Sequence, residues 1–329
     1  MFNDLRRSVT ALIKGVLVVL GGATADSGYA ANAAGGALIE IEPGNGPQWG
    51  TLSSLTAHAT DPRRLFAVTD QDSPPLRIVE IEVLETSARV VRQISVTAPD
   101  LHDLDVEGLV MKPDGGFWLA SEGQEGNSPP NVLLDVDADG RLLRTVNLPD
   151  AVADKIQRQG FEGVALVTSN GRQELVVSFQ SGFVGDADDV SRIGVVDLAS
   201  GVWTFYLYPL ERLEDGDVSG LSDILHLGDR RFALLERDGK GGRHALKWIT
   251  TIDLGTTSGA AADAAAPVLS KRRVVDLVPL FLDLDRKVEK EIEGLTIAAD
   301  GQVYAVTDND NKRATVLLRI GNRAEIFGR

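Results

Sequence analysis

The sequence predicts an all-β fold, a β-propeller with five blades of four antiparallel strands each, or six blades if one is degenerate. Two observations predict this fold. A pair of apolar strands joined by a turn recurs five times along the chain, and a second pair of strands follows most copies. Four strands per unit, repeated at a nearly constant spacing, are typical of propeller blades.

The recurring segment begins with a small or acidic residue and then Gly or Ser. An alternating apolar strand, a turn, a second apolar strand and a polar cluster follow. Period-two patterning, β-branched residues and turn residues favour strands over helices. The copies occupy residues 53–72, 107–124, 162–181, 219–239 and 293–310. Their starts lie 54, 55, 57 and 74 residues apart, and the longest gap contains the Ala/Gly-rich insert TTSGAAADAAAP at 256–267.

The second hairpins lie at residues 76–96, 131–148 and 191–208, and a short helical turn is expected near 150–158. Residues 34–50 precede the first copy and also contain an apolar strand. This strand belongs either to a sixth, degenerate blade or to the last blade, where it would close the ring. We therefore expect one propeller domain over residues 34–329.

The first thirty residues differ in composition from the rest. Arg6, Arg7 and Lys14 precede a short apolar run at 15–25, and small residues follow it. This order is typical of a secretory signal peptide, and the run is too short for a spanning helix. We expect residues 1–30 to be removed, by cleavage after Ala25, Ala30 or Ala33. Export by the general route fits better than twin-arginine export, and the mature chain would be periplasmic or secreted.

The chain is acidic, with a formal net charge of −15 among its 329 residues. Nucleic acid is an unfavourable partner for such a protein, because its phosphates would be repelled. The chain has no cysteine, which excludes disulfides, a cysteine nucleophile and Cys-ligated metal sites. A metal cation or a small ligand is the more favourable partner.

Carboxylates mark the ends of two of the recurring hairpins. If each Asp-Gly pair is a two-residue turn, Glu293 faces Asp308 and Glu107 faces Glu122. Like charges that lie directly opposite each other repel. The first strand of each blade is innermost in a propeller, so these acids should gather at one mouth of the central channel. Such crowding would raise their pKa values unless a cation lay between them.

We therefore predict a Ca²⁺ site, because Ca²⁺ takes roughly 6–8 oxygen ligands in flexible geometry. The predicted ligands are the acids at the ends of these strands, namely Glu107, Glu122, Glu162, Glu293, Asp308, Asp70 and Asp223. The alternative is that these acids are solvated, cap backbone N–H groups, or pair with the cations Arg237, Lys312 and Arg313.

At these residues the sequence resembles the bacterial family called esterase-like activity of phytase. The resemblance rests on DVEGLVMKPDGGFWLASEG, GFEGVAL and KVEKEIEGLTIAADGQVYAVTDND, and it covers residues 50–320. It implies an exported propeller related to the alkaline phytases, which use several Ca²⁺ ions to bind phosphate. Ser53 and Ser219 stand where the other copies have Glu, which leaves fewer carboxylates on those two blades.

Other motifs point to no site. DVDADG at 135–140 resembles the start of an EF-hand loop, but Val146 stands at its twelfth position, where that loop requires Glu. The serine elbow G-x-S-x-G of α/β-hydrolases is absent from the sequence. The four histidines are scattered without metal-ligand spacing.

Two functions remain open. One is a calcium-dependent hydrolase of phosphate or carboxylic esters, with Glu162 and Arg237 as catalytic candidates. Its anionic substrate would be bound by cations, for which the candidates are Arg237, Lys240, Lys312 and Arg313. The alternative is a propeller that binds a ligand or a protein and catalyses nothing. In both cases we expect a monomer with no membrane span in the mature chain.

Overall fold

The computed structural model describes residues 36–45, 49–69, 75–99, 101–123, 130–156, 160–308 and 314–328. In these ranges the chain consists mainly of strands, which confirms the all-β prediction. Three short helices occur in the described part, at α1 (Asp150–Ala153), α2 (Val278–Asp283) and α3 (Arg323–Ile326). α1 lies within the predicted 150–158 turn, whereas α2 and α3 were not predicted. The predicted signal peptide lies outside the described residues.

Among the helices described, none is long and apolar enough to cross a membrane.

Sixteen strands form four antiparallel groups of four in chain order, and the N-terminal strand joins the first of these groups to the last strands in one eight-stranded sheet. The first group contains β2 (Leu52–Ala57), β3 (Arg64–Thr69), β4 (Arg77–Val83) and β5 (Ala88–Ser95). The second contains β6 (Asp105–Met111), β7 (Phe117–Glu122), β8 (Val132–Val136) and β9 (Leu142–Asn147). The third contains β10 (Phe161–Ser169), β11 (Arg172–Phe179), β12 (Val190–Asp197) and β13 (Trp203–Pro209). The fourth contains β14 (Gly220–Gly228), β15 (Arg231–Arg237), β16 (Lys247–Asp253) and β17 (Lys271–Asp276).

The last group joins the two ends of the chain. β18 (Glu291–Ile297), β19 (Gln302–Asp308) and β20 (Val316–Asn322) are completed by the N-terminal strand β1 (Ala37–Glu42), which pairs antiparallel with β20. β1 also pairs in parallel with β5 of the first group at Ile41 and Glu42. Of the two sequence alternatives for the N-terminal strand, pairing with the last group is therefore the one observed.

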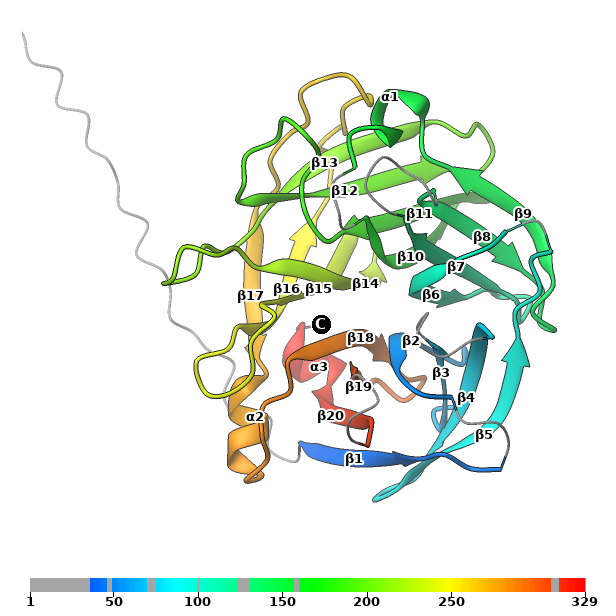
Figure 1. The fold of residues 1–329 in the computed structure, drawn as a ribbon, viewed down its shortest axis with the longest axis vertical. Helices are drawn as coiled ribbons and strands as arrows, with labels where there is room; N and C mark the ends of the chain where they lie inside the picture. The colour runs from blue at the N-terminus through cyan, green and yellow to red at the C-terminus, as the bar shows by residue number, and fades with distance from the viewer. Residues whose placement is uncertain are drawn as a thin grey trace, which may run out of the picture.

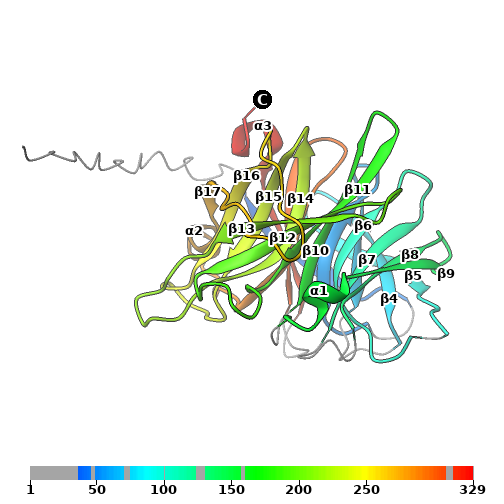
Figure 2. The ribbon, with the colours of Figure 1, turned by 90° about the horizontal axis from the view of Figure 1, so that it is seen from above.

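The groups are arranged around a central axis with their first strands innermost (Figure 1; Figure 2 gives the view turned by 90°). β2 contacts β6, β6 contacts β10, β10 contacts β14, β14 contacts β18, and β18 contacts β2. The starts of these strands therefore lie around one end of the ring. A cavity of about 190 Å³, lined mostly by apolar residues of the same strands, lies further along them; Leu55, Leu166 and Ile297 are examples.

The hydrophobic core is divided among the interfaces between neighbouring groups. Trp118 of β7 and Phe161 of β10, for example, belong to one cluster between the second and third groups. Leu221 of β14 packs with Val176 of β11 between the third and fourth. Each sheet is therefore apolar on both faces, and the polar residues that remain buried are concentrated at the strand ends.

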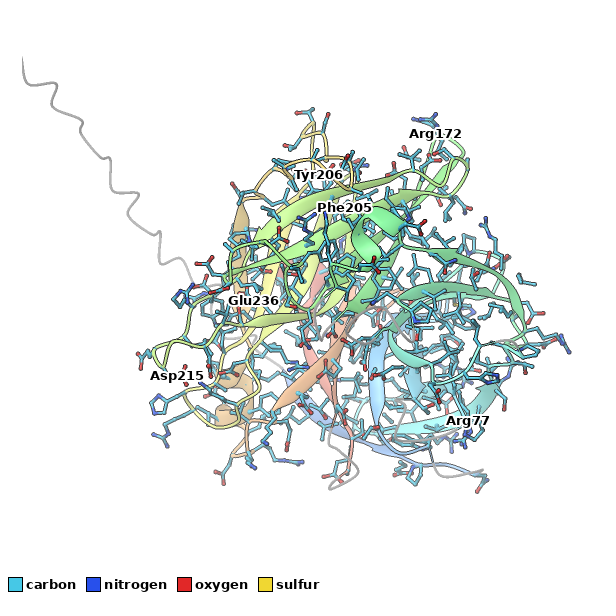
Figure 3. All side chains as sticks on the ribbon, turned by 45° about the horizontal axis from the view of Figure 1, so that its top comes forward. Arg77, Arg172, Phe205, Tyr206, Asp215 and Glu236 are labelled. Carbon is cyan, nitrogen blue, oxygen red and sulfur yellow. The ribbon has the colours of Figure 1, made fainter. Side chains whose placement is uncertain are left out.

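The Ala/Gly-rich insert at 256–267, which we call the edge segment, connects β16 to β17 but runs along β13 of the preceding group. Phe205 N donates to Ala260 O at 2.8 Å, and Leu207 N donates to Pro267 O at 2.9 Å. Phe205 and Tyr206 of β13 are labelled in Figure 3. The edge segment thereby provides hydrogen-bond partners for the outer edge of β13.

Candidate functional site

The first strand of each group is irregular near its start. In β6, β10, β14 and β18 the pairing with the next strand shifts at this point, which inserts a β-bulge. Superposing these shifts makes Glu107, Glu162, Ser222 and Glu293 equivalent. In β2 the pairing shifts between Ser53 and Thr56, so Ser53, which precedes Ser54 as Glu107 precedes Gly108, is still paired, with Val68. Ser222, rather than the predicted Ser219, is therefore the fourth member of this set. Bulges re-aim side chains and are common next to functional sites.

Glycine follows the bulge glutamate because the next group approaches too closely for any side chain. A Cβ at Gly108 would lie 2.3 Å from Glu162 O, and a Cβ at Gly163 would lie 2.3 Å from Ile224 N. A Cβ at Gly294 would lie 2.5 Å from the carbonyl carbon of Ser54. The repeated Glu-Gly pair thus places a carboxylate beside a close backbone contact between successive groups.

In the other two groups a polar side chain replaces this glycine and binds the next strand. Ser54 Oγ accepts a hydrogen bond from Leu109 N at 3.0 Å, and Asp223 Oδ2 accepts one from Leu295 N at 2.7 Å. The other oxygen of Asp223, Oδ1, accepts from Ile224 N at 2.8 Å. Burial raises the pKa of Asp223 well above its ordinary value, although these backbone hydrogen bonds oppose the shift. Both oxygens of Asp223 are thus engaged by backbone N–H groups, one in β14 and one in β18.

The observed register differs from the predicted one. Asp105, not Glu107, faces Glu122, and Glu291, not Glu293, faces Asp308. The reason is partly the bulge and partly the turn. Lys112 N donates to Gly116 O at 2.7 Å, so the β6–β7 loop has three residues instead of the predicted two.

The bulge nonetheless brings the predicted carboxylates together. Asp105, Glu107 and Glu122 are each partly buried, and one oxygen from each lies within 4.8 Å of the others. Glu122 Oε1 also accepts a hydrogen bond from Gly160 N at 2.7 Å, which fixes its side chain against the entry to β10. These three residues are called the acid cluster below. Sequence analysis missed Asp105, although its position two residues before Glu107 would have placed it on the same face of a strand.

Glu162 lies beside the acid cluster and is only 3% exposed. Burial raises the pKa of Glu162 well above its ordinary value, and the charges of Glu122, Glu107 and Glu293 raise it further, while Arg237 opposes them. Glu162 Oε1 accepts a hydrogen bond from Gln180 Nε2 at 2.7 Å. Gln180 is another residue that sequence analysis did not select.

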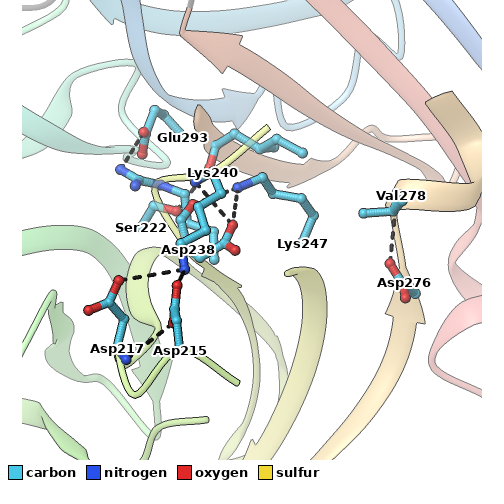
Figure 4. Close-up of polar contacts among 11 residues, drawn as sticks. Asp215, Asp217, Ser222, Asp238, Lys240, Lys247, Asp276, Val278 and Glu293 are labelled. Carbon is cyan, nitrogen blue, oxygen red and sulfur yellow. Dashed lines mark hydrogen bonds and ion pairs between the residues drawn. The ribbon is translucent and has the colours of Figure 1, made fainter. Parts of the chain in front are cut away.

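An ion pair forms the other side of the site. Arg237 Nη2 donates to Glu293 Oε1 at 2.6 Å, across the boundary between the fourth and last groups (Figure 4). Burial disfavours the charge of Arg237, but Glu293, Glu162 and Glu291 raise its pKa. Burial also disfavours the charged form of Glu293 and so raises its pKa, while the charge of Arg237 opposes this shift. The guanidinium is therefore charged and is held by carboxylates.

A second buried pair stands behind this one. Lys247 Nζ donates to Asp238 O at 2.5 Å and to Asp238 Oδ1 at 2.8 Å, and the Lys247 side chain is fully buried. Burial lowers the pKa of Lys247, while Asp238 opposes the shift. Because Asp238 directly follows Arg237 in the chain, this pair fixes the backbone at the end of β15.

The remaining candidates are placed as follows. Lys240 is an ion-pair partner of Asp215 and Asp217 on an exposed loop (Figure 4), so the structure does not bring it to Glu293. Asp308 ends β19 opposite Glu291. Asp70, Lys312 and Arg313 lie outside the described residues. Ser219 Oγ donates to the buried Glu236 at 2.6 Å.

Comparison with known proteins gives one family match. A family model described as phytase-like, esterase-like activity of phytase, matches residues 47–311. No curated protein matches the sequence.

Several solved structures are distantly similar to the chain. An α-L-arabinofuranosidase from Lactobacillus brevis is 10% identical, with a TM-score of 0.48 over 82% of this chain and 91% of the other. The catalytic domain of a GH62 α-L-arabinofuranosidase from Coprinopsis cinerea is 12% identical, with a TM-score of 0.47 over 88% and 98%. A glucose dehydrogenase is 14% identical, with a TM-score of 0.39 over 85% of both chains.

Proposed function

The chain belongs to the phytase-like family, whose description is esterase-like activity of phytase. We propose that it is an exported hydrolase that uses Ca²⁺ to cleave phosphate or carboxylic esters. The observation that supports it is the gathering of Asp105, Glu107 and Glu122 next to the buried Glu162. We further propose that the five strand groups are the blades of a five-bladed propeller.

The donor set favours a bound cation. The mostly buried Arg237 pairs with Glu293. Carboxylate oxygens held close together at partial burial are the donor set that a hard cation prefers. The residues therefore fit Ca²⁺, with Asp105, Glu107 and Glu122 as the ligands that this chain supplies.

The residues of the site have separable roles in the proposed reaction. When bound, Ca²⁺ would polarise the oxygen of the ester and attract an anionic substrate. Glu162, whose pKa is raised by its surroundings, can take a proton at its carboxylate from an attacking water. Arg237 supplies a fixed positive charge for the oxygen that becomes negative. Gln180 holds the Glu162 carboxylate in place by its hydrogen bond.

The test is hydrolysis by the purified mature protein. Aryl phosphates and aryl carboxylic esters are offered with Ca²⁺ and with a chelator. We expect calcium-dependent release of the phenol, reduced in Glu162→Gln and in Arg237→Lys. Hydrolysis that persists in chelator would contradict the calcium requirement. Calcium binding without hydrolysis of either ester class would favour the non-catalytic binding module instead.

Export is tested separately by N-terminal sequencing of the mature protein, which should begin near residue 26, 31 or 34. A product that retains Met1 would contradict it.

A further inference from the structure

The ion pair between Arg237 and Glu293 is incomplete. A single hydrogen bond joins them, from Nη2 to Oε1 at 2.6 Å. Arg237 Nε and Glu293 Oε2 are both buried, and neither has a hydrogen-bond partner among the described residues. A buried polar atom without a partner loses its hydration and gains nothing in return, so each such atom needs a specific explanation.

The chain contains a matched pair whose two-bond fork is closed, although Arg192 Nη1 is also buried without a partner in the described part of the chain. Arg192 Nε donates to Asp186 Oδ2 at 2.7 Å, and Arg192 Nη2 donates to Asp186 Oδ1 at 2.7 Å. Both side chains are 11% exposed, which is close to the 15% and 7% of Arg237 and Glu293. A closed, two-bond fork is therefore attainable in this protein at similar burial, but Arg237 and Glu293 do not form one.

Neighbouring side chains do not supply the missing partners. Lys247 Nζ donates twice to Asp238. Ser222 Oγ donates to Ile292 O at 2.9 Å, within the strand that carries Glu293. The unsatisfied donor and the unsatisfied acceptor thus belong to one ion pair, and the missing second hydrogen bond of this pair is called the opening below.

We propose that this opening is a hydroxyl-binding subsite, in which one hydroxyl oxygen accepts a hydrogen bond from Arg237 Nε and its proton is donated to Glu293 Oε2. A hydroxyl group is both donor and acceptor at a single oxygen, which is what the two atoms require. A carboxylate or phosphate oxygen could accept from Arg237 but would face the oxygen of Glu293. A metal cation or an ammonium group could bind Glu293 but would face the guanidinium.

The hydroxyl has two sources, a water molecule or an alcohol group of a ligand. Its role in catalysis, as the attacking water or as a hydroxyl of the substrate, rests on the proposed hydrolysis. The existence of the subsite does not, since it follows from Arg237 and Glu293 alone.

The experiment is a pair of crystal structures of the mature protein, one in plain aqueous buffer and one soaked in ethylene glycol. We expect an ordered oxygen within hydrogen-bond distance of both Arg237 Nε and Glu293 Oε2. If the diol displaces it, the subsite takes ligand hydroxyls; if the same oxygen remains in both crystals, it is a water site. A closed two-bond pair, or an ion between the two atoms, would overturn the proposal.

A variant tests the subsite in solution, with 2-fluoroethanol as the probe and fluorine NMR line broadening as the readout. Arg237→Lys keeps the positive charge but removes Nε, so both the broadening and the bridging oxygen should be lost. Arg192→Lys removes a comparably buried arginine from the closed fork and should leave both unchanged.

If the line broadening is equal in all three proteins and the aqueous crystal holds no bridging water, 2-fluoroethanol binds as an adventitious additive only, and the proposal is overturned. If the broadening is equal but the aqueous crystal holds the bridging water, the subsite is a water site. If Arg237→Lys does not fold, the wild-type crystals alone decide. Failure of ester hydrolysis would leave these results unaffected, so the two proposals fail separately.

Discussion

Burial and the neighbouring negative charges both raise the pKa of Glu162. It is 3% exposed, and the carboxylates of Glu122, Glu107 and Glu293 all raise its pKa. Sequence analysis selected all four residues because they recur at the ends of apolar strands. It could not provide their register, since a bulge adds a residue that alternation alone does not reveal. Asp105 was missed because it stands two residues before the recurring segment, which begins at Glu107.

The raised pKa of Glu162 predicts how stability depends on pH. Between its ordinary value of 4.5 and its higher folded value, the folded protein binds more protons than the unfolded one. The contribution of Glu162 to the free energy of unfolding is therefore complete below pH 4.5 and is lost as the pH rises through the folded pKa. A tenfold difference in proton affinity between the two states corresponds to about 1.4 kcal/mol. Denaturant titrations in chelator, across that window, should show a decrease that Glu162→Gln flattens.

The control for this measurement is Asp186, whose pKa is lowered because Arg192 and Phe183 N outweigh the effect of its burial. Asp186→Asn should alter the pH dependence of stability at acid pH and leave the decrease above pH 4.5 in place. An identical pH profile for wild type and Glu162→Gln would contradict the electrostatic account of the site.

At the scale of the strand, the Glu-Gly pair joins site and fold. The glutamate occupies the bulge, and the glycine allows the next first strand to approach its backbone. The repeated pair was visible in the sequence and marked the start of the first strand in three of the five copies. Sequence analysis recognised Ser53 in place of the glutamate but chose Ser219 instead of Ser222. Ser54 and Asp223 replace the glycine, and their hydrogen bonds to the next strand depend on how the sheets pack.

Gly163→Ala should therefore be destabilising although it adds one methyl group. The new Cβ would lie 2.3 Å from Ile224 N and 2.4 Å from Asp223 Oδ1, so β10 and β14 must separate. Overpacking of this kind costs about 1–3 kcal/mol. Gly239→Ala is the matched control, since nothing lies within 4 Å of its Cβ. Equal unfolding midpoints in denaturant for the two variants would contradict the close-approach account.

The edge segment protects a strand rather than the site. Phe205 N and Leu207 N of β13 donate to Ala260 O and Pro267 O, and an uncovered strand edge is a template for pairing with another chain. Removing residues 257–266 should thus cause concentration-dependent self-association, measured by light scattering after size exclusion. Adding Thr204→Lys on the same strand should suppress it, because an edge lysine disfavours pairing. A deletion variant that elutes like the wild type at all concentrations would show that β13 needs no cover.

At the scale of the whole molecule, the fold was more predictable than the chemistry. Strand pairs and their spacing follow from alternation and length. The N-terminal strand was left open between a sixth blade and the last blade, and its pairing with β20 decides between them. The gathering of charges around one end of the ring depends on contacts between groups far apart in the chain, such as Arg237 with Glu293. Sequence can suggest those contacts, but their geometry is set by how successive sheets pack.

Calcium should stabilise the whole fold if the acid cluster binds it. The cluster takes residues from β6 and β7, and Glu122 also fixes the start of β10, so a cation there ties two groups together. Binding to the folded state alone adds about 2.7 kcal/mol at a hundredfold excess over Kd. Chelator should therefore lower the melting temperature, and added Ca²⁺ should restore it.

Glu107→Gln should weaken this calcium response, because an amide is a poorer ligand than a carboxylate. Without metal, this variant should melt slightly higher than the wild type, because repulsion within the acid cluster is relieved. Glu214→Gln, on an exposed loop, should keep the full calcium response. If melting is the same with chelator and with Ca²⁺, the acids are held by solvent and protein alone, and the calcium-dependent hydrolase loses its main support.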